Sequence, residues 1–238
     1  MSLTVTQNGM KSFRTQVDQI ADNVANLQTP GFQAHLTEQQ ALSNQSGSTT
    51  IQTSLRTTTG PIKSTGRPLD LRLRGDQLFE LETANGAEFI RSGRFGRDSD
   101  GNIVHESSGQ RLLGRQGPLQ INDPESIQNI SVRQDGTVIG KTGQGNQTFG
   151  EIQPVRFPNP GGLRRGNNGT LRESANSGEP IRVDTARRAP VRSGELEMSN
   201  GSLIDQMLSL QRSQRFFELN SRAFRVQNQM LQRLTTNL

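Results

Sequence analysis

The chain has 238 residues and a formal net charge of +5 at pH 7, and only 29% of its residues are hydrophobic. This is little apolar material for a core of ordinary thickness, so we expect the chain to be elongated or to bury apolar surface against other chains. With no cysteine and only two histidines, His35 and His105, the sequence excludes disulfides, thiol catalysis and histidine-rich metal sites. We therefore expect no cofactor and no metal.

The basic charge balance leaves nucleic-acid binding open as an alternative, since a high isoelectric point is typical of such proteins. The arginines are scattered, however, and never run beyond two in succession, as in Arg164-Arg165. We favour an arginine-rich solvated surface and expect no nucleic-acid partner. No segment approaches the roughly 20 apolar residues of a membrane-spanning helix. The N-terminus also lacks the basic start and apolar core of a secretory signal, so any export would cleave nothing.

A first helix is predicted from residue 10 to residue 27. Its apolar residues recur in steps of three and four, which is the heptad pattern of a helix that packs against a partner helix. Pro30-Gly31 ends the helical segment, because proline disfavours helix before it and glycine permits a left-handed exit. These helix-seam residues are Met10, Phe13, Val17, Ile20, Val24 and Leu27.

A second helix is predicted from Ser202 to about residue 235, a stretch without proline or glycine. It carries two apolar stripes on roughly opposite faces, so it requires more than one partner. We assign the first stripe to the N-terminal helix: Leu210, Phe217, Phe224 and Leu231. We assign the second stripe to neighbouring subunits: Phe216, Leu219, Ala223, Val226 and Met230. Periodicity alone therefore predicts polymerisation through the terminal helices.

Between the helices the sequence predicts short antiparallel strands. Residues 69–74 alternate strictly between apolar and polar, and further apolar runs follow about every ten residues between turn pairs such as Asn85-Gly86. The expected fold class is α+β, with long N- and C-terminal helices forming a coiled-coil-like domain and an antiparallel all-β middle domain. The expected bounds are 1–32 and 199–238 for the paired helices, 33–66 for an extended connector, 67–157 for the β-domain and 158–198 for a loop-rich return segment.

The motifs that would carry catalysis or ligand binding are each incomplete. Residues 136–142 resemble a phosphate-binding loop but place three residues between the glycines, where four are required. Residues 98–109 resemble the start of a calcium-binding loop but place Gly109 where a bidentate glutamate is needed. Glu80 and Glu82 share a strand face with no apolar surroundings to separate their pKa values. We expect the protein not to be an enzyme.

Both ends of the chain resemble the bacterial flagellar axial proteins, the family of rod, hook and hook-associated subunits. Residues 21–32 (ADNVANLQTPGF) resemble the family's Ala-Asn-Asn-Leu-Ala-Asn-x-x-Thr-Pro-Gly-Phe. Residues 194–200 (GELEMSN) resemble its Gly-x-Leu-Glu-x-Ser-Asn, and residues 214–222 (QRFFELNSR) its Gln-Arg-Ala-Tyr-Glu-x-Asn-Ser-Lys. The matching positions are Ala21, Asn23, Ala25, Asn26, Thr29, Pro30, Gly31, Phe32, Ser199, Asn200, Gln214, Arg215, Glu218 and Asn220.

The middle of the chain carries the resemblance further. Residues 66–70 are similar to the segment that leads into the β-domain of rod proteins, and residues 89–95 are similar to their Tyr-Thr-Arg-x-Gly-x-Phe. Length and the β-rich middle favour the larger rod subunits. The closing segment at 229–234 leans to the distal type, whereas the length and residues 67–70 lean to the proximal type.

The resemblance implies a structural subunit of the flagellar basal-body rod. Such subunits are exported through the flagellar type III apparatus without a cleaved signal and polymerise through their terminal helices. The product is the hollow periplasmic shaft that transmits motor torque to the hook. The implied partners are copies of the chain itself, other rod and hook subunits, and the export apparatus. Another axial protein of the family, such as a hook protein, is the alternative, and a nucleotide- or nucleic-acid-binding protein is a distant one.

Overall fold

The computed structural model describes residues 3–41, 49–84, 86–121, 130–142, 145–185 and 190–236. The chain forms two compact units. The helical unit comprises residues 1–27, 35–54 and 201–238, and the β unit comprises residues 28–34 and 55–200. The chain therefore passes from one unit to the other at residues 27/28, 34/35, 54/55 and 200/201.

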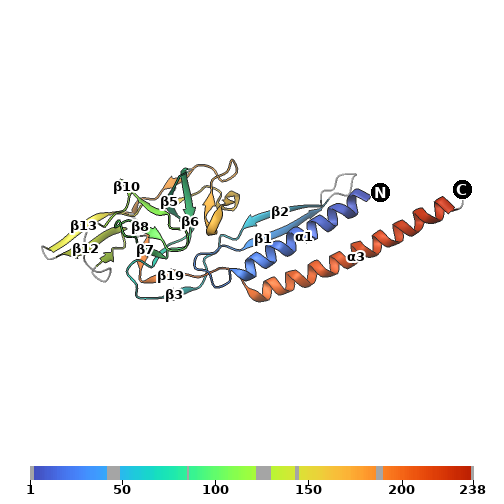
Figure 1. Ribbon diagram of the computed structural model, residues 1–238, viewed down its shortest axis with the longest axis horizontal. Coiled ribbons are helices and arrows are strands. Elements are labelled where there is room, and N and C mark those ends of the chain that lie inside the picture. The colour runs from blue at the N-terminus through green and yellow to red at the C-terminus, as the bar shows by residue number, and fades with distance from the viewer. Residues whose placement is uncertain are drawn as a thin grey trace. The chain divides into compact units, whose positions relative to one another are not determined.

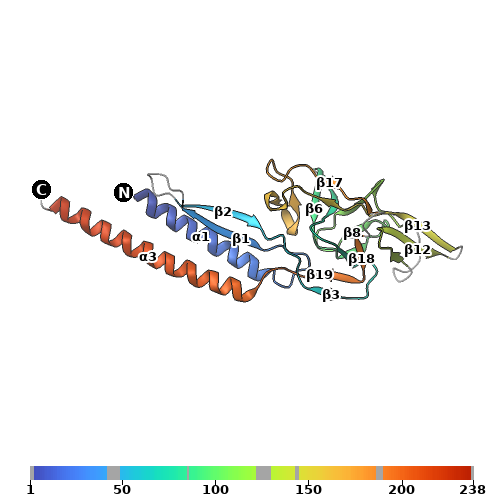
Figure 2. The same cartoon turned by 180° about the vertical axis from the view of Figure 1, so that it is seen from behind.

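The helical unit contains two helices and a β-hairpin. Helix α1 spans Leu3–Ala25 and runs antiparallel to helix α3, which spans Leu203–Thr236 (Figures 1 and 2). Strands β1 (His35–Ala41) and β2 (Thr49–Leu55) pair with each other, and β1 contacts α1. At the start of α3 the Ser202 hydroxyl accepts a hydrogen bond from the backbone N–H of Asp205 at 3.3 Å, which satisfies one donor of the first turn.

The β unit is built around one eight-stranded sheet in the order β15-β16-β6-β5-β9-β8-β7, with β10 paired to β9. Its strands are β5 (Phe79–Thr83), β6 (Gly86–Ile90), β7 (Phe95–Arg97), β8 (Ile103–His105), β9 (Arg111–Gly114), β10 (Gly117–Pro118), β15 (Arg164–Arg165) and β16 (Leu171–Arg172). Neighbouring strands pair antiparallel, as in the register Leu81↔Leu112 between β5 and β9.

Smaller sheets complete the β unit. A three-stranded sheet joins β11 (Ile130–Val132), β12 (Thr137–Thr142) and β13 (Gly145–Glu151). Three strand pairs join β14 (Val155–Arg156) to β17 (Ile181–Arg182), β18 (Val191–Ser193) to β4 (Leu71–Leu73), and β19 (Glu195–Glu197) to β3 (Ile62–Ser64). Short 3₁₀ turns lie at η2 (Pro160–Gly162) and η3 (Asn167–Gly169). Strands therefore occur in both segments for which the sequence predicts a connector or loops, 33–66 and 158–198.

The core of the β unit follows from strand alternation. In β4, Leu71 and Leu73 are each 1% exposed while the residue between them is half-buried, as a strand with one apolar face requires. Phenylalanine rings pack edge to face at Phe79–Phe95 and Phe89–Phe157, with centroids 5.0 and 4.8 Å apart. The sequence thus places its limited apolar content at every second strand position.

The expected fold class, α+β with a coiled-coil domain, is wrong. The described chain is mainly β, with a single helix at each end, and these helices form no coiled coil. A coiled coil buries its whole heptad seam, yet Met10 and Val24 are 38% and 40% exposed. Polar residues share the buried positions of the helix contact with Ile20, among them Asn23 and Gln206. Heptad spacing defines a stripe on one helix, but it does not determine whether the facing helix offers apolar holes to receive it.

Candidate assembly surface

The contact between α1 and α3 has a small apolar part. The rings of Phe13 and Phe217 stack with centroids 4.7 Å apart and an interplanar angle of 29°. Ile20, two turns further along α1, is 7% exposed. The structure thus brings together one residue from each of the two stripes that were assigned to an intramolecular helix seam.

The remainder of the contact is a polar junction around Asn23. Its side-chain nitrogen donates to Gln206 Oε1 at 3.1 Å and to the His35 carbonyl at 3.0 Å, and its oxygen accepts the His35 N–H at 2.9 Å. This buried amide therefore links α1, α3 and β1 and has partners for both its donor and acceptor groups. Near the end of α1, Asn26 donates to the Asp22 carbonyl at 2.9 Å. Both asparagines belong to the family signature.

The other residues of the two predicted stripes lie in varied environments. Val17, Leu27, Leu210, Phe216 and Phe224 are half-buried. Leu219 and Val226, assigned to neighbouring subunits, are 64% and 51% exposed. The side chains of Ala223, Met230 and Leu231 lie outside the described residues. On the second stripe, the structure therefore exposes Leu219 and Val226 and partly covers Phe216.

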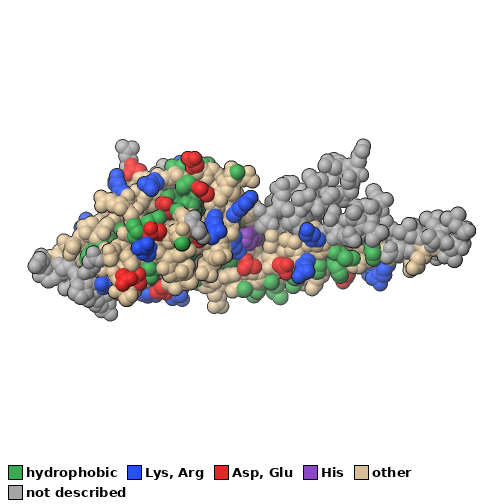
Figure 3. Space-filling model, turned by 45° about the horizontal axis from the view of Figure 1, so that its top comes forward, with side chains coloured by type: hydrophobic (Ala, Val, Ile, Leu, Met, Phe, Trp, Pro, Cys, Tyr) green, Lys and Arg blue, Asp and Glu red, His purple; other side chains and the backbone are tan. Residues whose placement is uncertain are grey.

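The start of α3 carries a cluster of exposed apolar residues, of which the sequence analysis missed Ile204, Met207 and Leu208. Leu203, Ile204, Met207 and Leu208 are 51%, 71%, 59% and 46% exposed. Hydrophobic side chains are visible along this edge of the helical unit in Figure 3. The signal in the sequence is the step of three and four from Ile204 to Met207 and Leu208, which is too short to stand out as a heptad stripe. Clustered exposed apolar side chains mark interaction surfaces.

The second family signature forms a hydrogen-bonded junction inside the β unit. The Asn200 side-chain oxygen accepts the Ala34 N–H at 2.8 Å, and its nitrogen donates to the carbonyls of Arg56 and Thr58 at 2.6 and 2.8 Å. One amide thus fixes the segment that follows the Thr-Pro-Gly-Phe turn and the segment that follows β2. An aspartate could not replace it, because two of these three bonds require a donor.

Gly31 and Glu197 meet in the same junction. The Gly31 N–H donates to the Glu197 carbonyl at 2.7 Å, and a Cβ at position 31 would lie 2.2 Å from the backbone nitrogen of Ser92. The backbone of Gly31 is also left-handed, with φ of 66°. Only glycine fits here, because the position combines positive φ with backbone contact.

A buried ion pair lies beneath this junction. The Arg91 guanidinium contacts the Glu197 carboxylate, with Nε to Oε2 at 2.9 Å, and their side chains are 3% and 5% exposed. Arg91 also donates to the carbonyls of Leu73, at 3.1 Å, and Gln77. The second carboxylate oxygen of Glu197 accepts the Gly60 N–H at 3.1 Å. Both residues lie in quoted family motifs, yet no sequence signal indicated that they are partners.

The remaining signature residues are spread over both units. Phe32 is buried, and the Arg165 guanidinium stacks 4.3 Å from its ring centroid. Ser199 is buried, and Pro30 and Asn220 are half-buried. The exposed members are Ala21, Ala25, Thr29, Gln214, Arg215 and Glu218.

His105 has no catalytic arrangement around it in the described part of the chain. It is 2% exposed and packs edge-on against Phe95, and burial lowers its pKa to about 4. Its Nδ1 lies 3.1 Å from the Ser108 hydroxyl, which donates to Gln110, so no carboxylate orients the ring from this side. At neutral pH the imidazole is uncharged and acts as a core side chain.

The described residues contain no cluster of three or more His, Cys, Asp or Glu side chains that could hold a metal ion. They also contain no helix that is long and apolar enough to cross a membrane.

Three family models match successive parts of the chain. Residues 3–33 match the flagella basal body rod protein model, residues 72–140 match the flagellar hook protein FlgE/F/G D1 domain, and residues 192–238 match the C-terminal model of the flagellar basal body rod FlgEFG proteins. The matched segments carry the signature residues described above, including Asn23, Arg91 and Asn200.

Curated relatives match over nearly the full length. The chain is 31% identical to the flagellar basal-body rod protein FlgG of Bacillus subtilis, with 95% of each chain covered. It is 29% identical to FlgG of Borreliella burgdorferi over 97% of this chain and 96% of the relative. It is 30% identical to the basal-body rod protein FlgF of Escherichia coli over 84% of this chain and 82% of the relative.

A β unit held by the signature residues, together with terminal helices that expose apolar side chains, defines a structural subunit of a flagellar axial assembly. The chain belongs to the flagellar basal-body rod protein family. It is a structural subunit of the basal-body rod, and the family's names point to a structural protein and not to an enzyme. The relatives named here are all rod proteins, so the nucleotide- and nucleic-acid-binding alternatives are set aside.

Proposed function

We propose that the chain polymerises through α1 and α3 into the rod and that the resulting shaft transmits torque. One observation carries this proposal. Of the twelve exposed large hydrophobic residues in the described part of the chain, ten lie in the helical unit and only Ile62 and Ile181 lie in the β unit. Exposed apolar surface is thus concentrated on the helical unit.

The energetics favour burial of this surface between subunits. Covering a Leu or Val side chain contributes roughly 1.5–3 kcal/mol. In the proposed assembly, Leu219 and Val226 would meet an adjacent subunit, together with the second-stripe residues Phe216, Ala223 and Met230. The seam residues Phe13 and Phe217 already face each other within one subunit. A contact between different patches on identical subunits gives an open helical filament when its rotation does not close into a ring, and a shaft requires such a contact.

The buried ion pair of the β unit supports the torque-bearing part of the proposal. Arg91 and Glu197 join β-unit segments that are far apart in the sequence, and Asn200 adds three further bonds. A junction with so many bonds at fixed geometry resists shear. In the proposed shaft, this hydrogen-bonded junction of the β unit would therefore carry part of the twisting load.

Export, position and partners complete the proposal. We expect the chain to leave the cytoplasm through the flagellar type III apparatus without signal cleavage and to lie in the periplasmic rod beside other rod and hook subunits. The FlgG relatives cover 95–100% of this chain, whereas the FlgF relatives cover 84–91%, which favours a FlgG-type subunit. The hook-like alternative has weaker support, because the relatives named here are rod proteins.

Aspartate substitutions on α3 test the proposal. Leu219→Asp and Val226→Asp place a charge on the exposed second stripe, and Gln211→Asp places the same charge on an exposed polar position of the same helix. We expect the first two variants to abolish swimming and to yield basal bodies without complete rods, and Gln211→Asp to swim. The thermal unfolding temperature of the purified full chain, followed by the circular-dichroism signal of its β-sheets, should be unchanged in all three variants. Motile cells with intact rods that contain Leu219→Asp or Val226→Asp protein would refute polymerisation through this face.

A further inference from the structure

The sequence places glycine directly after asparagine at four positions, and asparagine is a chemically labile residue. These pairs are Asn8-Gly9, Asn85-Gly86, Asn168-Gly169 and Asn200-Gly201. In such a pair the backbone nitrogen of the second residue can attack the side-chain amide carbon of the first and close a five-membered ring. Glycine favours the attack because it has no Cβ and its backbone turns freely. Whether a pair reacts therefore depends on what the fold allows its side chain and its peptide to do.

The structure holds two of these pairs in place. The Asn200 side chain makes the three hydrogen bonds described above, at 2.6–2.8 Å. Asn8 lies inside α1, where the N–H of Gly9 belongs to the helical hydrogen bonds. Asn85 lies outside the described residues. Of the three described pairs, Asn168-Gly169 is therefore the one that the fold leaves free.

Asn168 and Gly169 form the exposed turn between β15 and β16. In the described part of the chain, neither the Asn168 side chain nor the Gly169 N–H has a hydrogen-bond partner. Asn168 has φ of 54° and ψ of 33°, and Gly169 has φ of 78°. With the Thr170 N–H donating to the Asn167 carbonyl at 3.1 Å, these angles define a type I′ turn.

Rotation of a single peptide would bring the reacting atoms of this turn together. At ψ of 33° the Gly169 nitrogen points away from the Asn168 side chain. Turning the peptide between the two residues changes type I′ into type II′, in which ψ of the first central residue is about −120°. The nitrogen then eclipses Cβ, as closure of a five-membered ring requires. A Cβ at position 169 would meet nothing within 4 Å in the described structure, so no neighbour obstructs the rotation.

We propose that Asn168 is a site of spontaneous deamidation in the folded protein. The Gly169 nitrogen bonds to Cγ of Asn168, the bond from Cγ to the side-chain nitrogen breaks, and ammonia leaves with the proton of the Gly169 N–H. Water then opens the ring at either carbonyl carbon, which yields aspartate or isoaspartate. The new carboxylate lowers the formal net charge by one, in a segment that also carries Arg164, Arg165 and Arg172. This inference goes beyond the proposed function and does not depend on polymerisation.

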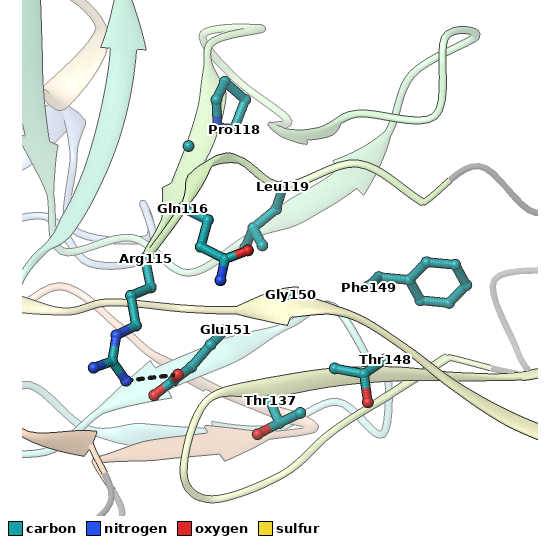
Figure 4. Close-up of a pocket in the computed structure, with 10 residues that line it drawn as sticks. Arg115, Gln116, Pro118, Leu119, Thr137, Thr148, Phe149, Gly150 and Glu151 are labelled. Carbon is teal, nitrogen blue, oxygen red and sulfur yellow. Dashed lines mark hydrogen bonds and ion pairs between the residues drawn. The ribbon is translucent and has the colours of Figure 1, made fainter.

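Gln116-Gly117 offers a matched comparison in a second hairpin turn. Gln116 projects from the turn between β9 and β10, beside the pocket that Phe149 and Glu151 also line (Figure 4). It is exposed, and a Cβ at position 117 would also lie in open space. The extra methylene of glutamine makes the ring six-membered, and this ring closes more slowly. Exposure and a following glycine are thus shared with Asn168, whereas ring size differs.

Incubation of the purified full chain tests the site. The protein is kept at mildly alkaline pH, once in native buffer and once in urea, and is then digested with chymotrypsin, which cleaves after Phe and Leu in this chain without Trp or Tyr. Peptides 164–171, 197–203 and 114–119 then contain Asn168, Asn200 and Gln116, respectively. Mass spectrometry follows the conversion of each amide to an acid. The variant Asn168→Gln is the control for residue 168.

The native and unfolded rates decide the outcome. In native buffer we expect Asn168 to react at least about tenfold faster than Asn200, whose hydrogen bonds must break first. In urea the two should react at similar rates, isoaspartate should be among the products, and Gln116 and Asn168→Gln should stay intact over the same period. Equal native rates for Asn168 and Asn200 would overturn the proposal. So would a product without isoaspartate, or a native Asn168 that stays intact while the unfolded chain reacts.

Discussion

The ion pair between Arg91 and Glu197 gives the most direct test of how the β unit is held together. We consider Glu197→Gln, which preserves the shape of the side chain and an acceptor oxygen but removes the negative charge. Arg91 would keep its bonds to the carbonyls of Leu73 and Gln77 and would lose its only carboxylate partner among the residues that the structure describes. Since its side chain is 3% exposed, water cannot replace the lost charge.

The expected cost follows from this burial. Removing one partner of a buried ion pair destabilises a protein by about 3–5 kcal/mol. Both carboxylate oxygens of Glu197 accept hydrogen bonds, from Arg91 and from the Gly60 N–H, so the amide nitrogen of a glutamine would face one of these donors. We therefore expect the middle of that range, about 4 kcal/mol. With a denaturant dependence of about 2 kcal/mol per molar urea, the unfolding midpoint should fall by about 2 M.

Glu195→Gln is the matched control. Glu195 pairs with Arg72 at 2.8 Å, but the two side chains are 34% and 15% exposed, so we expect a loss of at most about 1 kcal/mol. The double variant Arg91→Met/Glu197→Met should be more stable than Glu197→Gln, because it leaves no charge buried alone. Urea unfolding followed by circular dichroism measures all three. Equal midpoint shifts for Glu197→Gln and Glu195→Gln would refute the reasoning.

Two further predictions concern His105 and Gly31. Burial lowers the pKa of His105 to about 4, below the ordinary value of 6.5, so the unfolded chain binds a proton that the folded chain rejects. The contribution of the neutral His105 to the free energy of unfolding is therefore fully present above about pH 6.5 and is lost as the pH falls toward 4, by about 3 kcal/mol in all. Urea midpoints measured between pH 7 and pH 4 should show this decline, and His105→Leu should make the midpoint less dependent on pH. Gly31→Ala should destabilise the β unit by about 2–5 kcal/mol, because it adds left-handed strain and a clash with Ser92. Gly75→Ala has a similar φ of 63° in open space and should cost only about 1–2 kcal/mol by thermal unfolding; equal losses for the two glycines would contradict the clash.

Local patterns in the sequence were sufficient for the C-terminal helix and for a strand in the middle of the chain. The stretch without proline or glycine after Ser202 predicted a helix to about residue 235, and α3 spans Leu203–Thr236. Strict alternation at residues 69–74 predicted a strand, and β4 occupies Leu71–Leu73. Helix and strand periods are set by the backbone within a few residues, so a short window of sequence contains them.

Long-range partners were not predictable in the same way. Arg91 and Glu197 are 106 positions apart, and Asn23 and Gln206 are 183 apart. Each residue alone is compatible with a solvated surface, and only the fold shows that it is buried and paired. The exposed residues Ile204 and Met207 were missed for a related reason, because a stripe shows that a face is apolar but not whether anything covers it.

The sequence by itself determined the two terminal helices and the strand at residues 69–74, which protein family the signatures indicate, and that 29% hydrophobic residues leave little for a single thick core. The tertiary structure decided how that apolar material is distributed. It fills alternate strand positions of the β unit and leaves Leu219, Val226 and the start of α3 exposed. It also replaced the expected coiled coil with a helix contact that has Asn23 at its centre. Burial depends on which distant segments meet, and that is a property of the whole chain and not of any local period.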